Sequence, residues 1–188
     1  MLLLAACMAC HAGGTATGKG GDRLAIDRLY PMRAGSVWTY DVDTGEGGPP
    51  TLAITRVTQS AGGQVDITSG GPPIRYEQRA DGLYRGDRRA YVLKQPVRRG
   101  ATWDVGQGAT AEVLDVDKRV STPAGDFTGC VEVRESGGAT PKVVRTVFCP
   151  DVGPVELESS MGLAISGRSA RVVARLRGYD LAAAATAP

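Results

Sequence analysis

The chain has 188 residues, which is enough for one domain with a buried core. Its 22 basic and 20 acidic side chains nearly balance, so no nucleic-acid partner is expected. The four cysteines and the single histidine lack the spacing of a zinc site, so we predict no metal and no cofactor.

The chain begins with a short apolar stretch that ends in a cysteine. Leu4-Ala5-Ala6-Cys7 resembles the lipobox of bacterial lipoproteins. The resemblance implies cleavage before Cys7 and lipidation of that cysteine, which leaves residues 1–6 as a remnant of a signal peptide. A complete signal has an apolar region of about 7 to 15 residues, so we expect the true start to lie upstream. The alternative is an apolar beginning of a cytosolic protein.

A glycine-rich stretch follows the lipobox cysteine. Residues 7–22 have the composition of a flexible tether. A tether behind a lipidated cysteine lets a folded domain stand off a membrane. These residues predict an exported lipoprotein, anchored by its N-terminus at the periplasmic or outer-membrane face.

Residues 23–180 contain short alternating runs separated by Gly, Pro and Asp. The pattern predicts an all-β fold: a single antiparallel sandwich or open barrel-like domain of meander hairpins. In the first run, Trp38, Tyr40 and Val42 define an inward face, and we expect Leu52 and Ile54 to continue it. Residues 181–188 are expected to fray as a disordered tail.

The motif P-x-R-x-G-x-x-W occurs twice, from Pro31 to Trp38 and from Pro96 to Trp103. Each copy has a stiffening proline, a conformationally free glycine and an aromatic residue that opens an alternating run, which is typical of a corner leading into a strand. We therefore predict two similar halves with both tryptophans buried at equivalent positions. The architectural residues are Pro31, Gly35, Trp38, Pro96, Gly100 and Trp103.

Each corner also carries an arginine beside its glycine. Arg33 and Arg98 could contact a ligand, or they could cap carbonyl groups near their corners. The residues leave both interpretations open.

Two further local patterns make specific predictions. Asp81-Gly82, between two alternating runs, is the dipeptide preferred in a tight hairpin turn. Leu114, Val116 and Val120 are expected on one face of a long strand that Lys118 interrupts.

Cys130 and Cys149 lie in two apolar runs that can pair as a hairpin. If the two cysteines stand opposite one another, Val131 faces Phe148, Val133 faces Thr146, and the loop is 138–141. This register gathers the apolar residues on one face, which a one-residue slip would scatter. Opposed residues lie within disulfide range, so we predict a disulfide, with two free buried thiols as the alternative. The register also opposes Arg134 to Arg145, which Glu132 could relieve.

Several short motifs together resemble exported bacterial lipoproteins of unknown function, whose domain opens with Y-P-L-x-x-G-x-x-W-x-Y. The likeness spans residues 29–157, with Met32 where leucine is usual. It implies a mainly antiparallel β domain at the cell envelope and carries over no catalytic residue. The motifs are Tyr30-Pro31, Gly35, Trp38, Tyr40, Thr122-Pro123-Ala124-Gly125, Phe127, Gly129-Cys130, Phe148-Cys149-Pro150 and Val152-Gly153-Pro154-Val155.

Catalytic chemistry has little support in the sequence. The only histidine, His11, lies on the tether, where it cannot be held rigidly. Asp115 with Asp117, or Glu156 with Glu158, would share a strand face and could place two carboxylates together. Charged residues that alternate along an exposed strand are commoner. The arginines of the last run, 171–177, could likewise bind phosphate or simply pair with Glu156 and Glu158.

The sequence thus predicts a lipid-anchored envelope lipoprotein with a non-catalytic binding or structural β domain, and no catalytic residue. The first alternative is a carrier that encloses a hydrophobic ligand such as an acyl chain. The second is a carboxylate-dependent envelope enzyme. The expected partners are the membrane, through the anchor, and an envelope protein or hydrophobic ligand.

Overall fold

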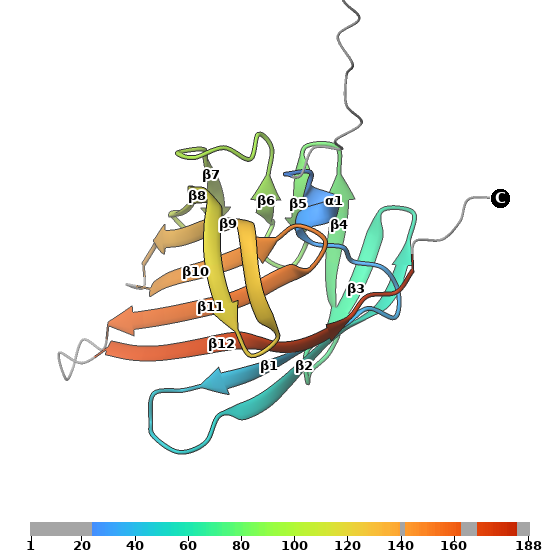
Figure 1. Cartoon of the computed structure of the whole chain (residues 1–188). Helices are drawn as coiled ribbons and strands as arrows, with labels where there is room; N and C mark the ends of the chain where they lie inside the picture. The colour runs from blue at the N-terminus through green and yellow to red at the C-terminus, as the bar shows by residue number, and fades with distance from the viewer. Residues whose placement is uncertain (1–23, 140–141, 163–168, 184–188) are drawn as a thin grey trace, which may run out of the picture.

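The computed structural model describes residues 24–139, 142–162 and 169–183. Twelve strands form one antiparallel sheet in which each strand pairs with the next along the chain, except β6 with β7, and β12 returns to pair with β1. The sheet curls into a nearly closed barrel (Figure 1), which confirms the all-β, barrel-like prediction. The elements are α1 (Ile26–Leu29), β1 (Val37–Asp43), β2 (Thr51–Ala61), β3 (Gln64–Thr68), β4 (Ile74–Arg79), β5 (Gly82–Arg85), β6 (Ala90–Lys94), β7 (Thr102–Gly106), β8 (Ala109–Thr122), β9 (Gly125–Gly137), β10 (Lys142–Cys149), β11 (Gly153–Gly162) and β12 (Ser169–Asp180).

The barrel consists of two six-stranded meanders, β1–β6 and β7–β12. The first and last strands pair along a ladder that runs from Val37 opposite Asp180 to Asp43 opposite Val173. At the other junction, β6 and β7 are the two ends of the sheet. Each predicted corner therefore opens one meander, and each lies where one half of the barrel meets the other.

Aromatic and aliphatic side chains fill the interior. The ring of Tyr30 packs edge-on against Trp38 with centroids 5.4 Å apart, and its centroid lies 6.1 Å from that of Phe148. Burial at this depth raises the pKa of the Tyr30 hydroxyl. The largest fully buried side chains are Trp38, Phe148, Leu29, Leu83, Leu93, Leu176, Val57, Val65, Val113, Val131, Val147 and Val155.

A single turn of helix, α1, precedes the first corner and was not predicted from the sequence. Its Leu29 is buried, and its Arg28 forms an ion pair with Asp151 in the turn between β10 and β11. The carbonyl of Leu24 accepts a hydrogen bond of 3.4 Å from Gln95, just after β6. The start of the domain thus ties together two distant parts of the barrel. Within the described residues, no helix is long and apolar enough to cross a membrane.

The predicted inward face of β2 is wrong. Leu52 and Ile54 are 60% and 50% exposed, and Val57 is 1% exposed. The cause is the register: Tyr40 stands opposite Ala53, so the odd-numbered residues of β2 share the core face with Trp38 and Tyr40. The first corner fixes this register, because Val57 exchanges backbone hydrogen bonds with Gly35 and Ser36.

The predicted face of β8 is also wrong in its first half. Val113 is fully buried, and Leu114 is not part of the core. The ladder with β9 shifts between Val113 and Asp115, so the alternation changes phase there. After the shift, Val116 and Val120 pack against the core as expected.

The turn between β4 and β5 uses Ala80 and Asp81 rather than Asp81 and Gly82, because Arg79 pairs with Gly82. Gly82 is needed for a different reason. A Cβ there would lie 2.4 Å from the carbonyl oxygen of Leu93. This glycine permits a close approach of two strands rather than a turn.

The domain continues past Asp180 into the predicted tail. Ala182 donates a backbone hydrogen bond of 3.1 Å to the hydroxyl of Ser36, and Leu181 packs against the core. The expected fraying is therefore wrong for residues 181–182. Residues 1–6, the tether 7–22 with Cys7 and His11, and positions 184–188 lie outside the described part of the chain.

Candidate functional site

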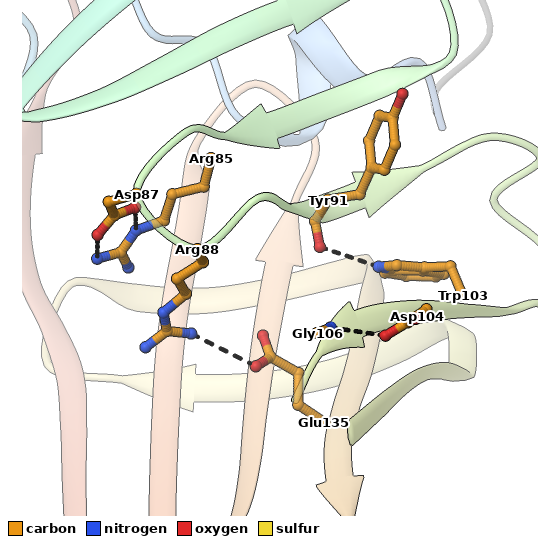
Figure 2. Close-up of polar contacts among 8 residues, drawn as sticks. All are labelled: Arg85, Asp87, Arg88, Tyr91, Trp103, Asp104, Gly106 and Glu135. Carbon is orange, nitrogen blue, oxygen red and sulfur yellow. Dashed lines mark hydrogen bonds and ion pairs between the residues drawn. The ribbon is translucent and has the colours of Figure 1, made fainter. Parts of the chain in front are cut away.

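The junction between β6 and β7 is held by side chains instead of a backbone ladder (Figure 2). The indole Nε1 of Trp103 in β7 donates a hydrogen bond of 3.0 Å to the carbonyl oxygen of Tyr91 in β6. Nearby, Nη1 of Arg88 lies 3.6 Å from Oε2 of Glu135 in β9, which makes an ion pair. The barrel is thus closed here by the indole of one side chain bound to the backbone of the neighbouring strand, with an ion pair to β9 beside it.

A hollow of about 360 Å³ opens beside this junction. Glu135 shares its strand face with Val131 and Val133, so it projects from the core-facing side of β9 where the barrel ends. Arg88 approaches it from the turn between β5 and β6. The other lining residues are Asp87, Val105, Gly106, Gln107, Ala109, Ser136, Gly137, Gly138, Ala139, Lys142 and Val144.

Charges at the rim of this hollow are mutually neutralised. Arg85 donates to both carboxylate oxygens of Asp87, at 2.7 and 2.8 Å. These hydrogen bonds hold the pKa of Asp87 below its ordinary value and raise that of Arg85. Burial raises the pKa of the neighbouring Tyr76 hydroxyl. The lowered pKa of Asp87 is opposite to the raised carboxyl pKa that a general acid needs.

A second hollow, of about 330 Å³, lies beside α1 near the opposite ends of β5 and β6. Its lining mixes apolar side chains with charged and amide groups. A carrier for an acyl chain would need an aliphatic lining, whereas this hollow includes Asp27, Arg79 and two glutamines. The lining residues are Ala25, Ile26, Asp27, Met32, Gln78, Arg79, Ala80, Gly82 and Gln95.

Strands β4 to β6 carry a strip of aromatic and charged residues, which we call the tyrosine strip: Arg79, Tyr84, Tyr91 and Lys94. The guanidinium of Arg79 lies 3.5 Å from the ring centroid of Tyr84, and the Tyr84 and Tyr91 rings meet edge-on at 5.3 Å. The Lys94 ammonium lies 4.8 Å from the Tyr91 ring. These cation–π contacts hold the rings in place on a partly exposed surface.

The two predicted corners have the same backbone hydrogen bonds. In the first, Gly35 donates to Val57 and Ser36 donates to Arg33; in the second, Gly100 donates to Val113 and Ala101 to Arg98. Val57 and Val113 each donate back, to Ser36 and Ala101. Trp38 and Trp103 are both buried, as predicted, with 0% and 7% exposure.

The corner arginines differ in their contacts. Arg33 donates a hydrogen bond of 3.1 Å to the carbonyl oxygen of Ala182, which fits the predicted capping role. Arg98 is exposed and has no side-chain partner among the described residues. A ligand-binding role for either arginine remains a prediction.

Cys130 and Cys149 form a disulfide with Cα atoms 4.3 Å apart. The observed ladder has Val131 opposite Phe148 and Val133 opposite Thr146, which confirms the predicted register, although positions 140–141 of its loop lie outside the described residues. On the N-terminal side of Cys130, β9 no longer pairs with β10, and the hairpin of β8 and β9 extends to β12. There the backbone N–H of Ala124 donates a hydrogen bond to the carbonyl oxygen of Leu176. The disulfide therefore lies where this hairpin departs.

Among the predicted carboxylate pairs, Glu156, Glu158 and Asp115 each form an ion pair with an arginine. Glu156 accepts from Arg175 at 3.1 Å and Glu158 from Arg171 at 2.8 Å, as expected for a solvated face. The hydrogen bond from Arg171 lowers the pKa of Glu158. Asp115 accepts from the backbone of Asp117, which lowers its pKa.

The like-charge repulsion between the opposed arginines of β9 and β10 is relieved by a different carboxylate from the one that we expected. Arg134 does stand opposite Arg145. Its partner is Glu112 at 2.6 Å, because Glu132 instead binds Lys118 at 2.9 Å.

Sequence reasoning missed the junction residues Arg88, Tyr91 and Glu135. They come from strands and turns far apart in the chain, and none belongs to a motif. The only available signal was the second tryptophan, which indicated that β7 opens at a special position. Among the described residues, no group of three potential ligands could hold a metal ion.

No family model matches the chain, and no curated protein matches it in sequence. Its fold is similar to that of a Bacteroides fragilis protein assigned as exported with a YmcC-like fold. The TM-score is 0.51 and the identity 13%, over 80% of this chain and 98% of that one. A Parabacteroides distasonis protein assigned as a lipoprotein gives a TM-score of 0.43 and 11% identity, over 81% and 98%. The chain has the YmcC-like fold.

Proposed function

We propose that this protein is a lipid-anchored lipoprotein of the cell envelope whose β domain binds a partner without catalysis. The observation that carries the proposal is the disulfide between Cys130 and Cys149, because disulfides persist in oxidising compartments outside the cytosol. The resemblance of Leu4-Ala5-Ala6-Cys7 to a lipobox supports export through the lipoprotein route. One solved structure with a similar fold comes from a protein assigned as exported.

The electrostatics favour binding over catalysis. The carboxylates with resolved shifts have pKa values lowered by hydrogen bonds, chiefly from arginine side chains, as at Asp87, Asp151 and Glu158. A general acid at neutral pH needs the opposite shift, which burial away from cations would give. These groups are suited to stabilising the fold and its surface.

The tyrosine strip supports a protein partner. Tyrosine and arginine are enriched at protein interfaces, where large amphipathic side chains bury area at low entropic cost. Tyr84 and Tyr91 are held in place by Arg79, and Tyr91 also donates to Asp81 at 2.8 Å. We place the contact with an envelope protein on this surface.

Metabolic labelling with palmitate tests the anchor. In the native host, expressed from its own gene, the protein should incorporate label and fractionate with membranes. Cys7→Ser should abolish labelling, and Cys10→Ser is the matched control that should retain it. A full-length, unlabelled, soluble protein, or label that persists in Cys7→Ser, would rule out this anchor.

Native mass spectrometry distinguishes binding from the carrier alternative. We expect the purified protein to have the mass of the chain with its disulfide and any N-terminal lipid, because the core side chains occupy the interior. A stoichiometric, non-covalent lipid that survives purification would favour the carrier.

A further inference from the structure

One ion pair beside the junction of β6 and β7 differs from the others in the barrel. Arg88 and Glu135 approach to 3.6 Å, whereas each of the other ion pairs among the described residues has a distance of 3.1 Å or less. A separation of 3.6 Å is too long for a hydrogen bond. The guanidinium of Arg88 and the carboxylate of Glu135 therefore attract each other but keep their hydrogen-bonding capacity for another partner.

Glu135 is a carboxylate on the apolar face of its strand. It shares the core-facing side of β9 with Val131 and Val133, and Val144 of β10 stands directly opposite it. Its side chain is 23% exposed, and no hydrogen bond from the described residues reaches its carboxylate. A largely buried carboxylate is stabilised by charged donors more than by neutral ones. Glu135 is thus suited to accept from a cationic group that enters the hollow.

The other carboxylate at the rim is already engaged. Both oxygens of Asp87 accept from Arg85, and Figure 2 shows this pair beside Arg88, which extends toward Glu135. Lys142 lines the same hollow and adds a positive charge that attracts anions. One cation that binds anions and one carboxylate that binds cations therefore lie side by side at the mouth of the hollow.

The hollow also gives these two charges an apolar wall. Its volume of about 360 Å³ lies within the range of small-molecule sites, about 300 to 1,000 Å³. Val105, Ala109 and Val144 line it together with Glu135. Ligand sites combine such walls with a few polar groups that fix the orientation of the ligand.

We propose that this hollow binds an α-amino acid with a small or medium apolar side chain. The ligand's carboxylate accepts hydrogen bonds from Arg88, and its ammonium group donates to Glu135. The four charges then alternate in sign around a ring, so each adjacent pair attracts and the contact between Arg88 and Glu135 is retained. The ligand's side chain lies against Val105 and Val144. The hollow shares no lining residue with the tyrosine strip, so this is a binding site beyond the proposed function.

NMR titration of the full chain tests the class of ligand. The purified protein carries Cys7→Ser and Cys10→Ser, so that neither a lipid nor a free thiol of the tether interferes. Alanine, valine and leucine are added separately, each in both enantiomers. We expect at least one to shift the amide signals around Arg88 and Glu135 with a dissociation constant below about 1 mM. No saturable binding up to about 10 mM, or shifts confined to other parts of the barrel, would overturn the proposal.

Truncated analogues test the two charges of the ligand separately. For leucine, 4-methylpentanoate keeps the carboxylate and lacks the ammonium group, and 3-methylbutylamine keeps the ammonium group and lacks the carboxylate. We expect each analogue to bind at least about tenfold more weakly than the amino acid, because each leaves one charged group of the protein without its partner. An analogue that binds as tightly as the amino acid would overturn the two-charge recognition.

Charge-removing variants assign the two charges to their residues. Glu135→Gln should weaken the amino acid at least about tenfold without weakening 4-methylpentanoate, and Arg88→Gln should do so without weakening 3-methylbutylamine. A merely structural change would weaken all three ligands alike. The matched control is Arg89→Gln, which changes an exposed arginine outside the hollow and should leave every affinity unchanged. Equal losses for the three ligands, or an effect of Arg89→Gln as large as that of Arg88→Gln, would overturn the assignment.

Discussion

The two halves of the barrel meet at two junctions. Each junction follows a copy of the same corner, but different interactions close the two junctions. At β1, the strand after the first corner pairs with β12 along a full ladder. At β7, the strand after the second corner is joined to β6 by the indole of Trp103. The corners share their backbone hydrogen bonds, so the difference arises from what each strand meets.

The indoles show what the difference means. Where β12 supplies the ladder, Trp38 turns its N–H across the barrel to the carbonyl oxygen of Val152, at 2.7 Å, and supports the core. Where no ladder forms, Trp103 uses its N–H to hold the neighbouring strand. A repeated local motif can therefore serve the core at one place and a closure at another.

The largest difference should appear when each tryptophan is replaced by alanine. Trp38→Ala removes a fully buried ring and should lower the free energy of unfolding by about 3 to 5 kcal/mol. Trp103→Ala should cost less globally and should accelerate amide exchange in β6 and β7. Denaturant unfolding and hydrogen exchange measure the two effects. Equal losses of stability, with no local opening in Trp103→Ala, would contradict the comparison.

Removing the disulfide should affect the first junction more than the second. Replacing Cys130 and Cys149 by alanine should cost about 3 kcal/mol on the loop-entropy model. The N–H of Val152 bonds to the carbonyl of Cys149, and the Val152 carbonyl accepts from Trp38, so the signal of Trp38 should change. Near-UV circular dichroism in Trp103→Phe and Trp38→Phe backgrounds isolates each indole. A near-UV signal that changes only for Trp103 would contradict this prediction.

Alanine at the corner glycines should cost the same at both corners. Gly35 and Gly100 have φ values of +91° and +77°, and a Cβ at either would meet no close backbone atom. The cost is therefore the left-handed conformation itself, about 1 to 2 kcal/mol. Gly71→Ala is the control, since its φ is not left-handed and its surroundings are open. Unequal losses in thermal or denaturant unfolding would show that the corners are not equivalent.

The smallest effect concerns two carboxylates near the junctions. A hydrogen bond from Arg28 holds the pKa of Asp151 below its ordinary value of 3.8, and the backbone of Asp117 does so for Asp115. A depressed pKa stabilises the fold above that ordinary value, and this contribution is lost as the pH falls through the folded-state pKa. Arg28→Gln should raise the pKa of Asp151 and leave that of Asp115 unchanged, as followed by NMR titration. A shift of both would show that the two regions are coupled.

Some features could be predicted because local chemistry determines them. Cys130 and Cys149 fixed the register of β9 with β10, since any slip would have exposed the apolar residues of that hairpin. The face of β2 could not be predicted, because Ala53 and Thr55 occupy its core side and the larger Leu52 and Ile54 its outer side. The phase change in β8 was hidden for a similar reason, since a bulge leaves no distinct signature in an alternating run.

The sequence by itself determined the strands, the two corners, the disulfide pairing and the division into two halves. Each depends on residues close together in the chain, or on a covalent pair whose geometry allows few alternatives. Only the tertiary structure decided that β12 forms a ladder with β1 while Trp103 joins β7 to β6, and that Leu52 and Ile54 face outward. These outcomes depend on which distant strands become neighbours, and the alternation of side chains along one strand carries no information about that.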